Sequence, residues 1–307
     1  MPVNGPPPAR PQKMLRGAAR RPLPPTQRLA RFLRTPKGTV LWVLLGLVVV
    51  AMLGTTRHTL PGVVAAVAAA LAVDMTLSRW RSGRWSFPTG ALLSGLFVAL
   101  VLARETPLYV PLATAGLAVG VKHAVRTRWS NVFNPAALAL IVSALLFHSG
   151  QSWWGALPYD SVVGSALILA AAWYVAAKIN KLPLGLAFLA ATLGIFTLAA
   201  FFGGTAEVAQ VFRAPDINAL MFFAGFMLTD PPTSPARQSD QVWFGLVAGV
   251  IAAAVFLLTG VQWFILAGLP VANACESVRR VVAAQQRSSV AGGRGRGPVR
   301  AAVDQGR

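Results

Sequence analysis

Acidic residues, histidine and cysteine are scarce in this chain. Its 307 residues include 9 Asp and Glu, 3 His and 1 Cys, against 28 Lys and Arg. The single cysteine, Cys275, excludes a disulfide, an iron–sulfur cluster or a zinc site built from cysteines of this chain alone. The sequence also lacks a Walker loop, a GxGxxG turn, a zinc ligand set and a catalytic triad. We therefore predict no metal site and no catalytic side chains.

Charged residues of either sign are few as well. They make up 12% of the chain, where a soluble domain has about a quarter, while 55% of the residues are apolar and the mean hydropathy is +0.59. This composition predicts an all-α polytopic membrane protein. The net charge of +19 lies in the tails and short loops, which argues against nucleic-acid binding.

Both tails are basic. Residues 1–37 hold nine Lys and Arg among many prolines and lack the apolar core of a signal peptide. They predict a disordered cytoplasmic tail that orients the chain or contacts the lipid surface. A Gly/Arg-rich tail is expected over residues 281–307, which leaves 38–280 as the membrane domain.

Ten apolar spans fill that domain, and several are shorter than the roughly 20 residues that a straight crossing needs. Short spans suggest helices that stop inside the protein. The ten spans are 38–54, 60–77, 89–103, 107–121, 134–148, 161–177, 183–203, 216–228, 241–259 and 261–276.

Charge distribution orients these spans. With the N-terminus in the cytoplasm, all Lys and Arg fall on the cytoplasmic side except Arg57, Arg104 and Arg213. Ten crossings with both termini inside follow. Weak matches such as Asn134 with Asn273 suggest two five-helix inverted repeats, about 38–148 and 161–276, a plan typical of transporters.

Two polar segments lie at span ends on the cytoplasmic side. In FNPA, Asn134 can cap a helix that Pro135 begins, so that free N–H groups face a polar or anionic group; a plain helix start is the alternative. In TDPPTSP, Thr229 and Asp230 end a span that the following prolines stop. An acid at a membrane boundary is a functional candidate, although Asp230 could equally be a solvated loop residue.

Other polar residues give weaker signals. Asp74 lies near the cytoplasmic end of the second span and is expected to pair with Arg79 or Arg81. Lys122 and His123 follow the fourth span, where a lone histidine is more often a loop residue than a ligand. Most of the nine tryptophans sit at span ends, as in an interfacial belt.

Three segments resemble the NqrB/RnfD family of membrane subunits in Na⁺-translocating NADH:quinone reductase and in the Rnf electron-transport complex. They are PTGALLSGLFVALVLARETPLYVPL, KHAVRTRWSNVFNPAALAL and INALMFFAGFMLTDPPTSP, in family order, and the resemblance covers about residues 38–280. It implies a urea-transporter-like fold of ten helices in inverted repeats, bound flavin, partner subunits, a bacterial-type inner membrane, and electron transfer coupled to Na⁺ or H⁺ movement.

One family feature is missing. Family members attach FMN to a threonine in the outer loop after the FNPA helix, but here that loop is HSGQSWWGALPYD, and no Thr lies between Thr127 and Thr192. Ser161 and Ser165 are the nearest hydroxyls. We therefore predict no covalent FMN.

A non-covalent riboflavin or FMN could remain at the cytoplasmic helix ends, with polar donors at the edge of the ring and an aromatic on its face. The predicted flavin-binding residues are Asn131, Phe133, Asn134, Pro135, Thr229, Asp230, Lys122 and Asn273.

Two functions stay open at this point. The chain is either one redox subunit of a larger oxidoreductase, without an NADH or iron–sulfur site of its own, or an inverted-repeat transporter or channel for a small solute that has lost the flavin chemistry. The retained FNPA and TDPPTSP favour the first reading, and the missing threonine favours the second. The fold alone does not decide between them.

Overall fold

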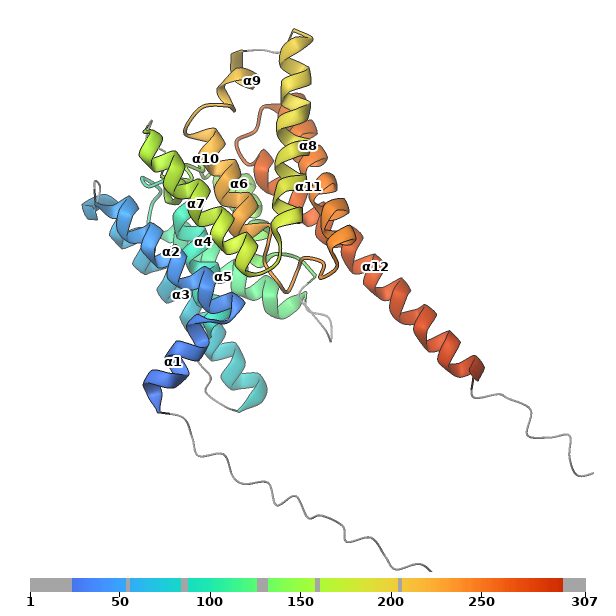
Figure 1. Ribbon diagram of the computed structural model, residues 1–307. Helices are drawn as coiled ribbons and strands as arrows, with labels where there is room; N and C mark the ends of the chain where they lie inside the picture. Colours follow the sequence, from blue (N-terminus) through green and yellow to red (C-terminus); the bar gives the residue numbers. More distant parts are fainter. Residues whose placement is uncertain are drawn as a thin grey trace, which may run out of the picture.

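The computed structural model describes residues 24–53, 56–83, 88–125, 132–157, 161–203 and 206–294. Within these ranges the chain forms helices and one isolated β-bridge, between Leu102 and Gln151. Figure 1 shows a bundle from which the last helix projects away. The helices are α1 (Pro25–Leu33), α2 (Pro36–Met52), α3 (Thr56–Ser82), α4 (Thr89–Val101), α5 (Tyr109–Ala124), α6 (Pro135–Phe147), η1 (Trp154–Ala156), α7 (Val162–Lys178), α8 (Leu182–Phe201), α9 (Ala206–Gln210), α10 (Asp216–Phe222), η2 (Phe223–Met227), α11 (Gln238–Thr259) and α12 (Phe264–Arg294).

Each predicted span corresponds to a helix, so the all-helical class is confirmed. The eighth span is α10 continued by η2, a π-helical turn. Among the described residues, three helices are long and apolar enough to cross a membrane, and they lie within α3, α8 and α11. The shorter apolar helices are α2, α4, α6, α7 and the α10–η2 segment. The inverted repeat stays a prediction. Helix α1 lies inside the predicted N-terminal tail, and α12 continues past residue 280 to Arg294.

Small residues allow α8, α11 and α12 to approach closely. A Cβ on Gly245 would lie 2.4 Å from the Leu184 carbonyl oxygen, and a Cβ on Gly268 would lie 1.9 Å from that of Ala248. Neither distance is possible for a real side chain, so these positions require glycine. Membrane helices commonly associate through such contacts, because lipid provides no hydrophobic force between them.

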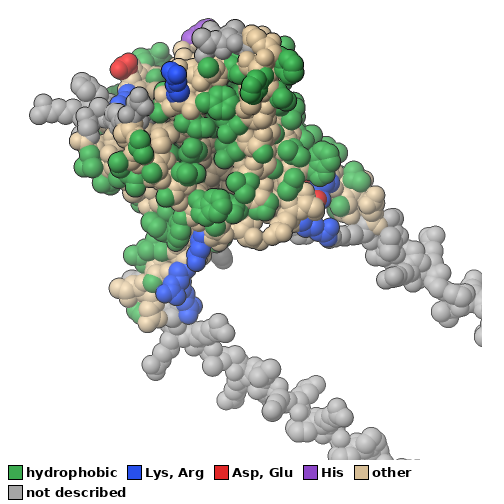
Figure 2. All heavy atoms as spheres, turned by 45° about the horizontal axis from the view of Figure 1, so that its top comes forward, with side chains coloured by type: hydrophobic (Ala, Val, Ile, Leu, Met, Phe, Trp, Pro, Cys, Tyr) green, Lys and Arg blue, Asp and Glu red, His purple; other side chains and the backbone are tan. Residues whose placement is uncertain are grey.

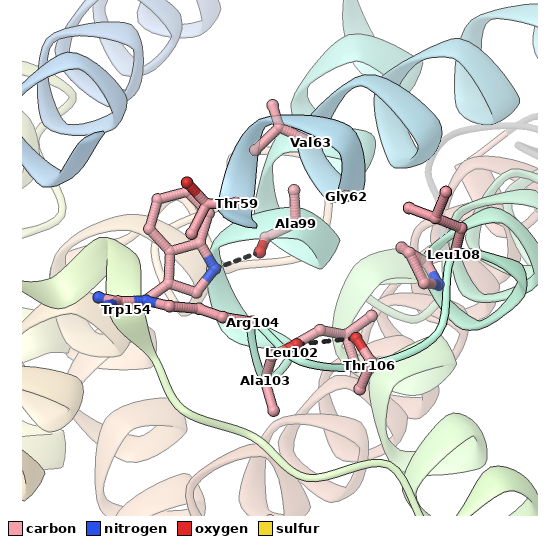
Figure 3. Close-up of a pocket in the computed structure, with 11 residues that line it drawn as sticks. Thr59, Gly62, Val63, Ala99, Leu102, Ala103, Arg104, Thr106, Leu108 and Trp154 are labelled. Atoms are coloured by element: carbon pink, nitrogen blue, oxygen red, sulfur yellow. Dashed lines mark hydrogen bonds between the residues drawn. The ribbon is translucent and has the colours of Figure 1, made fainter. Parts of the chain in front are cut away.

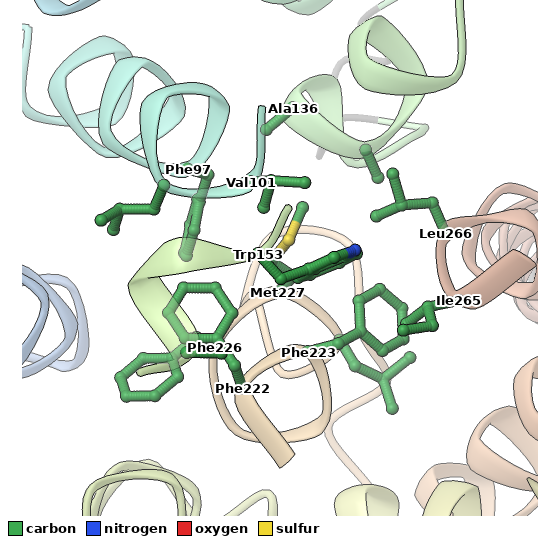
Figure 4. Packing of buried hydrophobic residues seen from close by; sticks show 14 of the residues in the cluster. Phe97, Val101, Ala136, Trp153, Phe222, Phe223, Phe226, Met227, Ile265 and Leu266 are labelled. Atoms are coloured by element: carbon green, nitrogen blue, oxygen red, sulfur yellow. The ribbon is translucent and has the colours of Figure 1, made fainter. Parts of the chain in front are cut away.

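An aromatic cluster fills the centre of the bundle around η2. The Phe222 and Phe226 rings lie 5.0 Å apart, and the Trp153 ring lies 6.3 Å from the rings of both Phe222 and Phe223 (Figure 4). Trp153 comes from the loop after α6 and is 5% exposed. π-helical turns are frequent at functional sites, so the polar residues at the end of η2 are candidates for such a site.

Candidate functional site at the ends of α6 and η2

Asn134 begins α6 in the predicted way. Its Oδ1 accepts hydrogen bonds from the backbone N–H groups of Ala136 and Ala137, both at 3.1 Å, and Pro135 is the first helical residue. The side chain is 3% exposed. Two of the free N–H groups at this helix end are therefore satisfied within the protein rather than by a ligand.

The same side chain joins the two polar segments. Asn134 Nδ2 donates to the carbonyl oxygen of Met227, the last residue of η2, at 3.1 Å. The residues concerned are 93 positions apart in sequence. FNPA and TDPPTSP thus meet in space, at one end of the bundle.

Beyond Met227 the chain folds into a tight polar loop. Thr229 is fully buried, and its Oγ1 donates to the Gly225 carbonyl oxygen at 2.7 Å. The carbonyl oxygen of Asp230 accepts from the backbone N–H groups of Thr233 and Ser234, at 3.1 and 3.0 Å. These bonds hold the loop in one conformation directly after the π-helical turn.

Two cations from other helices hold this loop in place. Lys181, at the start of α8, donates to the Pro235 carbonyl oxygen, and Arg280 of α12 donates to that of Ser234 at 3.0 Å. Arg280 also pairs with Glu276 at 2.7 Å. The end of the bundle where α8, α11 and α12 meet is therefore crosslinked through loop carbonyls.

Burial shifts the pKa values of two groups here. It raises the pKa of the Asp230 carboxyl to about 6, against the opposing effects of Lys37, a Thr233 hydrogen bond and Lys181. Burial, followed by repulsion from Arg280, lowers the pKa of Lys181 to about 8. Asp230 can therefore exchange a proton near neutral pH.

Asn273 of α12 is the exceptional polar residue at this end. It is 1% exposed, yet neither Nδ2 nor Oδ1 of its carboxamide has a hydrogen-bond partner among the described residues. It precedes Arg280 by seven residues, or two helical turns, so it lies on the same face of α12, deeper in the bundle. A buried amide without partners is costly, at about 1–3 kcal/mol for each unsatisfied group, and needs an explanation.

Lys122 belongs to a different cluster. Its Nζ lies 2.9 Å from Asp74 Oδ1, and His123 Nε2 lies 2.8 Å from the same oxygen. The expected pairing of Asp74 with Arg79 or Arg81 is wrong, because Asp74 faces α5, where Lys122 and His123 lie in the last turn.

Two further predicted residues, Phe133 and Pro135, lie at the start of α6. Phe133 is half-buried, and Pro135 is buried at the first position of the helix. Asn131 lies outside the described residues. No interaction of these residues with Asn273 is resolved, so the flavin-binding set as a whole stays a prediction.

The loop at the opposite end of α6 contains two buried tryptophans. Trp153 and Trp154 are 5% and 2% exposed, and Trp154 Nε1 donates to the Ala99 carbonyl oxygen at 2.7 Å. A pocket of about 40 Å³ beside Trp154 is lined by Arg104, whose guanidinium lies 5.8 Å from the indole centroid (Figure 3). That volume suits one or two water molecules and not a flavin ring.

Ser161, the nearest alternative to the missing threonine, has a structural role. It caps α7, and its Oγ accepts from the Gly164 N–H at 2.9 Å. Ser161 is thus used as a helix cap in the same way as Asn134, without a bond to a distant helix.

Sequence reasoning missed the crosslinks around the polar loop. Lys181 and Arg280 were counted only as charges that orient the chain, although their position next to span ends was a usable signal. Their carbonyl acceptors could not be inferred, because carbonyl groups carry no signature in sequence. Among the described residues no group of three or more His, Cys, Asp or Glu could hold a metal ion.

The sequence was compared with known proteins. The sequence model of the NQR2, RnfD, RnfE family matches residues 24–166 and 159–264, which together cover most of the chain. No curated protein matches the chain.

Proposed function

Because the chain belongs to the NQR2, RnfD, RnfE family, whose members are multi-pass membrane subunits of ion-translocating redox complexes, we propose that it is a flavin-binding electron-transfer subunit of such a complex. In this role it binds a non-covalent riboflavin or FMN. Electron transfer through the complex is coupled to Na⁺ or H⁺ movement, and both termini lie in the cytoplasm.

The unpartnered carboxamide of Asn273 carries this proposal. It offers a donor and an acceptor side by side within a buried site, and neither has a hydrogen-bond partner in the described part of the chain. An imide or amide ring edge, such as the pyrimidine edge of a flavin, presents the complementary acceptor and donor. A ligand of this class would remove the cost of burying the amide.

Residues at the ends of α6 and η2 would complete the site. Asn134 and Thr229 are already hydrogen-bonded within the protein, so they shape the site and leave little capacity to bind a ligand. Asp230, with its pKa near 6, is the group placed to accept or return a proton when the charge of a nearby ligand changes. The flavin, when bound, supplies one- and two-electron transfer that no side chain in this chain provides.

The proposal excludes covalent FMN. The loop that would carry it has no threonine, and its two tryptophans are packed inside the bundle. The adjacent Ser161 is engaged as the cap of α7. A single, releasable flavin is therefore proposed.

Visible spectroscopy tests the proposal. The full-length protein is purified in mild detergent, and its spectrum is recorded before and after acid precipitation. We expect flavin absorbance that moves to the supernatant, and a flavin affinity about tenfold lower in Asn273→Leu, measured by titrating flavin back onto the protein, since lost hydrogen bonds worth about 1.4 kcal/mol reduce affinity tenfold.

The matched control is Asn218→Leu. Asn218 is also a fully buried asparagine, but its Nδ2 donates to the Leu157 carbonyl oxygen at the opposite end of the bundle, and only its Oδ1 lacks a partner among the described residues, so this variant should keep its flavin. Flavin left in the pellet would instead show covalent attachment and point to Ser161 or Ser165. Folded protein without flavin would refute the proposal and favour a transporter or channel for a small solute.

A further inference from the structure

Helix α1 has two chemically different faces. At 100° per residue, Leu29, Phe32 and Leu33 share one side, and Gln27 and Arg31 lie on the other. Phe32 and Leu33 are half-buried against the protein, but Leu29 is 58% exposed. The apolar face thus extends beyond what the bundle covers.

The corner between α1 and α2 fixes the direction of α1. Thr35 Oγ1 donates to the Phe32 carbonyl oxygen at 2.7 Å and accepts from the Gly38 N–H at 3.1 Å. A Cβ on Gly38 would lie 2.0 Å from the Phe32 carbonyl oxygen, so only glycine permits this close turn. The result is a sharp change of direction from α2 to α1 (Figure 1).

Aromatic residues mark the membrane surface near this corner. Trp42 of α2 and Tyr174 of α7 form an edge-to-face pair with centroids 5.7 Å apart, and they are 44% and 45% exposed. Exposed Trp and Tyr on membrane helices prefer the interface. Trp42 lies six residues after Pro36, or about 9 Å along the helix, so a bilayer whose surface lies at this belt would place α1 at the level of the lipid headgroups.

Exposed positive charge surrounds the corner, where Lys37 also acts electrostatically on Asp230. Arg31, Arg34 and Lys37 are exposed, and no ion pair within the described ranges involves them. No Asp or Glu precedes Asp74 in the sequence. Figure 2 shows Lys and Arg side chains gathered where α1 leaves the apolar body of the molecule.

We propose that α1 is an interfacial helix, and that Arg31 of α1 together with Arg34 and Lys37 of the corner after it binds the headgroups of anionic phospholipids. Leu29 inserts into the adjacent acyl region. An acidic surface of a protein partner would also match the charge, but it would not explain an exposed leucine at the level of the headgroups beside the first span. A purely orienting charge would need neither the amphipathic helix nor the fixed corner. The proposal is independent of flavin binding.

Lipid quenching in nanodiscs tests the proposal on the full-length chain. A fluorophore is attached at Leu29→Cys in a Cys275→Ser background. The nanodiscs contain phosphatidylglycerol and phosphatidylcholine, and either the first or the second lipid is brominated. We expect stronger quenching by brominated phosphatidylglycerol than by brominated phosphatidylcholine, and a loss of this preference at high salt. Replacing Arg31, Arg34 and Lys37 by Gln should weaken the preference about fivefold per charge, or roughly 100-fold in all.

A matched variant removes three charges that precede α1 in the sequence, at Arg10, Lys13 and Arg16, and should keep most of the preference. Equal quenching by the two lipids in the unmodified protein would overturn the proposal without any need for the charge variants. An equal loss in both triple variants would also overturn it, because the effect would then belong to total charge. Loss of a co-purifying protein from the α1 variant, with unchanged lipid preference, would assign the surface to a protein partner instead.

Discussion

Asn134 should contribute more to stability than an ordinary helix cap, because it performs two tasks. Losing a cap costs about 1 kcal/mol. Losing the bond from Nδ2 also leaves the Met227 carbonyl oxygen with only the longer bond from the Asp230 N–H, at 3.4 Å, and costs about 1 kcal/mol more. Asn134→Ala should therefore lower the free energy of unfolding by about 2 kcal/mol. SDS titration of the detergent-solubilised protein, followed by circular dichroism, measures this difference.

Two companion variants separate the two tasks. Asn134→Ser keeps a capping oxygen but cannot reach Met227, so it should recover about 1 kcal/mol of the loss. Ser161→Ala removes a cap without a second bond and should cost only about 1 kcal/mol. If Asn134→Ala costs no more than Ser161→Ala, the bond between α6 and η2 does not stabilise the fold, and our account of how the two polar segments are joined is wrong.

Two further predictions concern the charged and the close-packed residues. Burial raises the pKa of Asp230 from 3.8 to about 6, so the stability that its protonated carboxyl contributes is full below pH 4 and is lost as the pH rises through 6. Thermal unfolding measured between pH 5 and 7.5 should show this loss in the wild type and not in Asp230→Asn. An equal dependence of the melting temperature on pH in the two proteins would contradict the prediction. Gly38→Ala should destabilise the protein by about 1–3 kcal/mol and expose α1 to tryptic cleavage, because the added Cβ would collide with the Phe32 carbonyl oxygen. Gly46→Ala on the same helix should be neutral or stabilising, because a Cβ there would have no atom within 4 Å. Equal tryptic cleavage rates for the two glycine variants would count against a fixed corner.

Local signals predicted much of this molecule. Asn134 and Pro135 read as a helix start because capping depends on a few neighbouring residues, and the structure has that cap. The short eighth span proved to be α10 and η2, stopped by the prolines after Asp230. Asp74 was assigned the wrong partners because the nearest arginines in sequence were chosen, whereas its true partners come from α5, 48 and 49 residues away.

The sequence by itself determined the membrane class, the approximate position of the helices that form the ten apolar spans, and the family, because composition, apolar runs and caps are properties of short segments. Only the tertiary structure decided that Asn134 reaches Met227, that Lys181 and Arg280 hold the polar loop, and that the Asn273 carboxamide is buried without partners. Those features depend on which helix faces meet. The helices of this chain are apolar on nearly every face, so the periodicity of apolar residues does not specify which helix faces pack together. Side-chain packing and hydrogen bonds between distant segments determine that pairing.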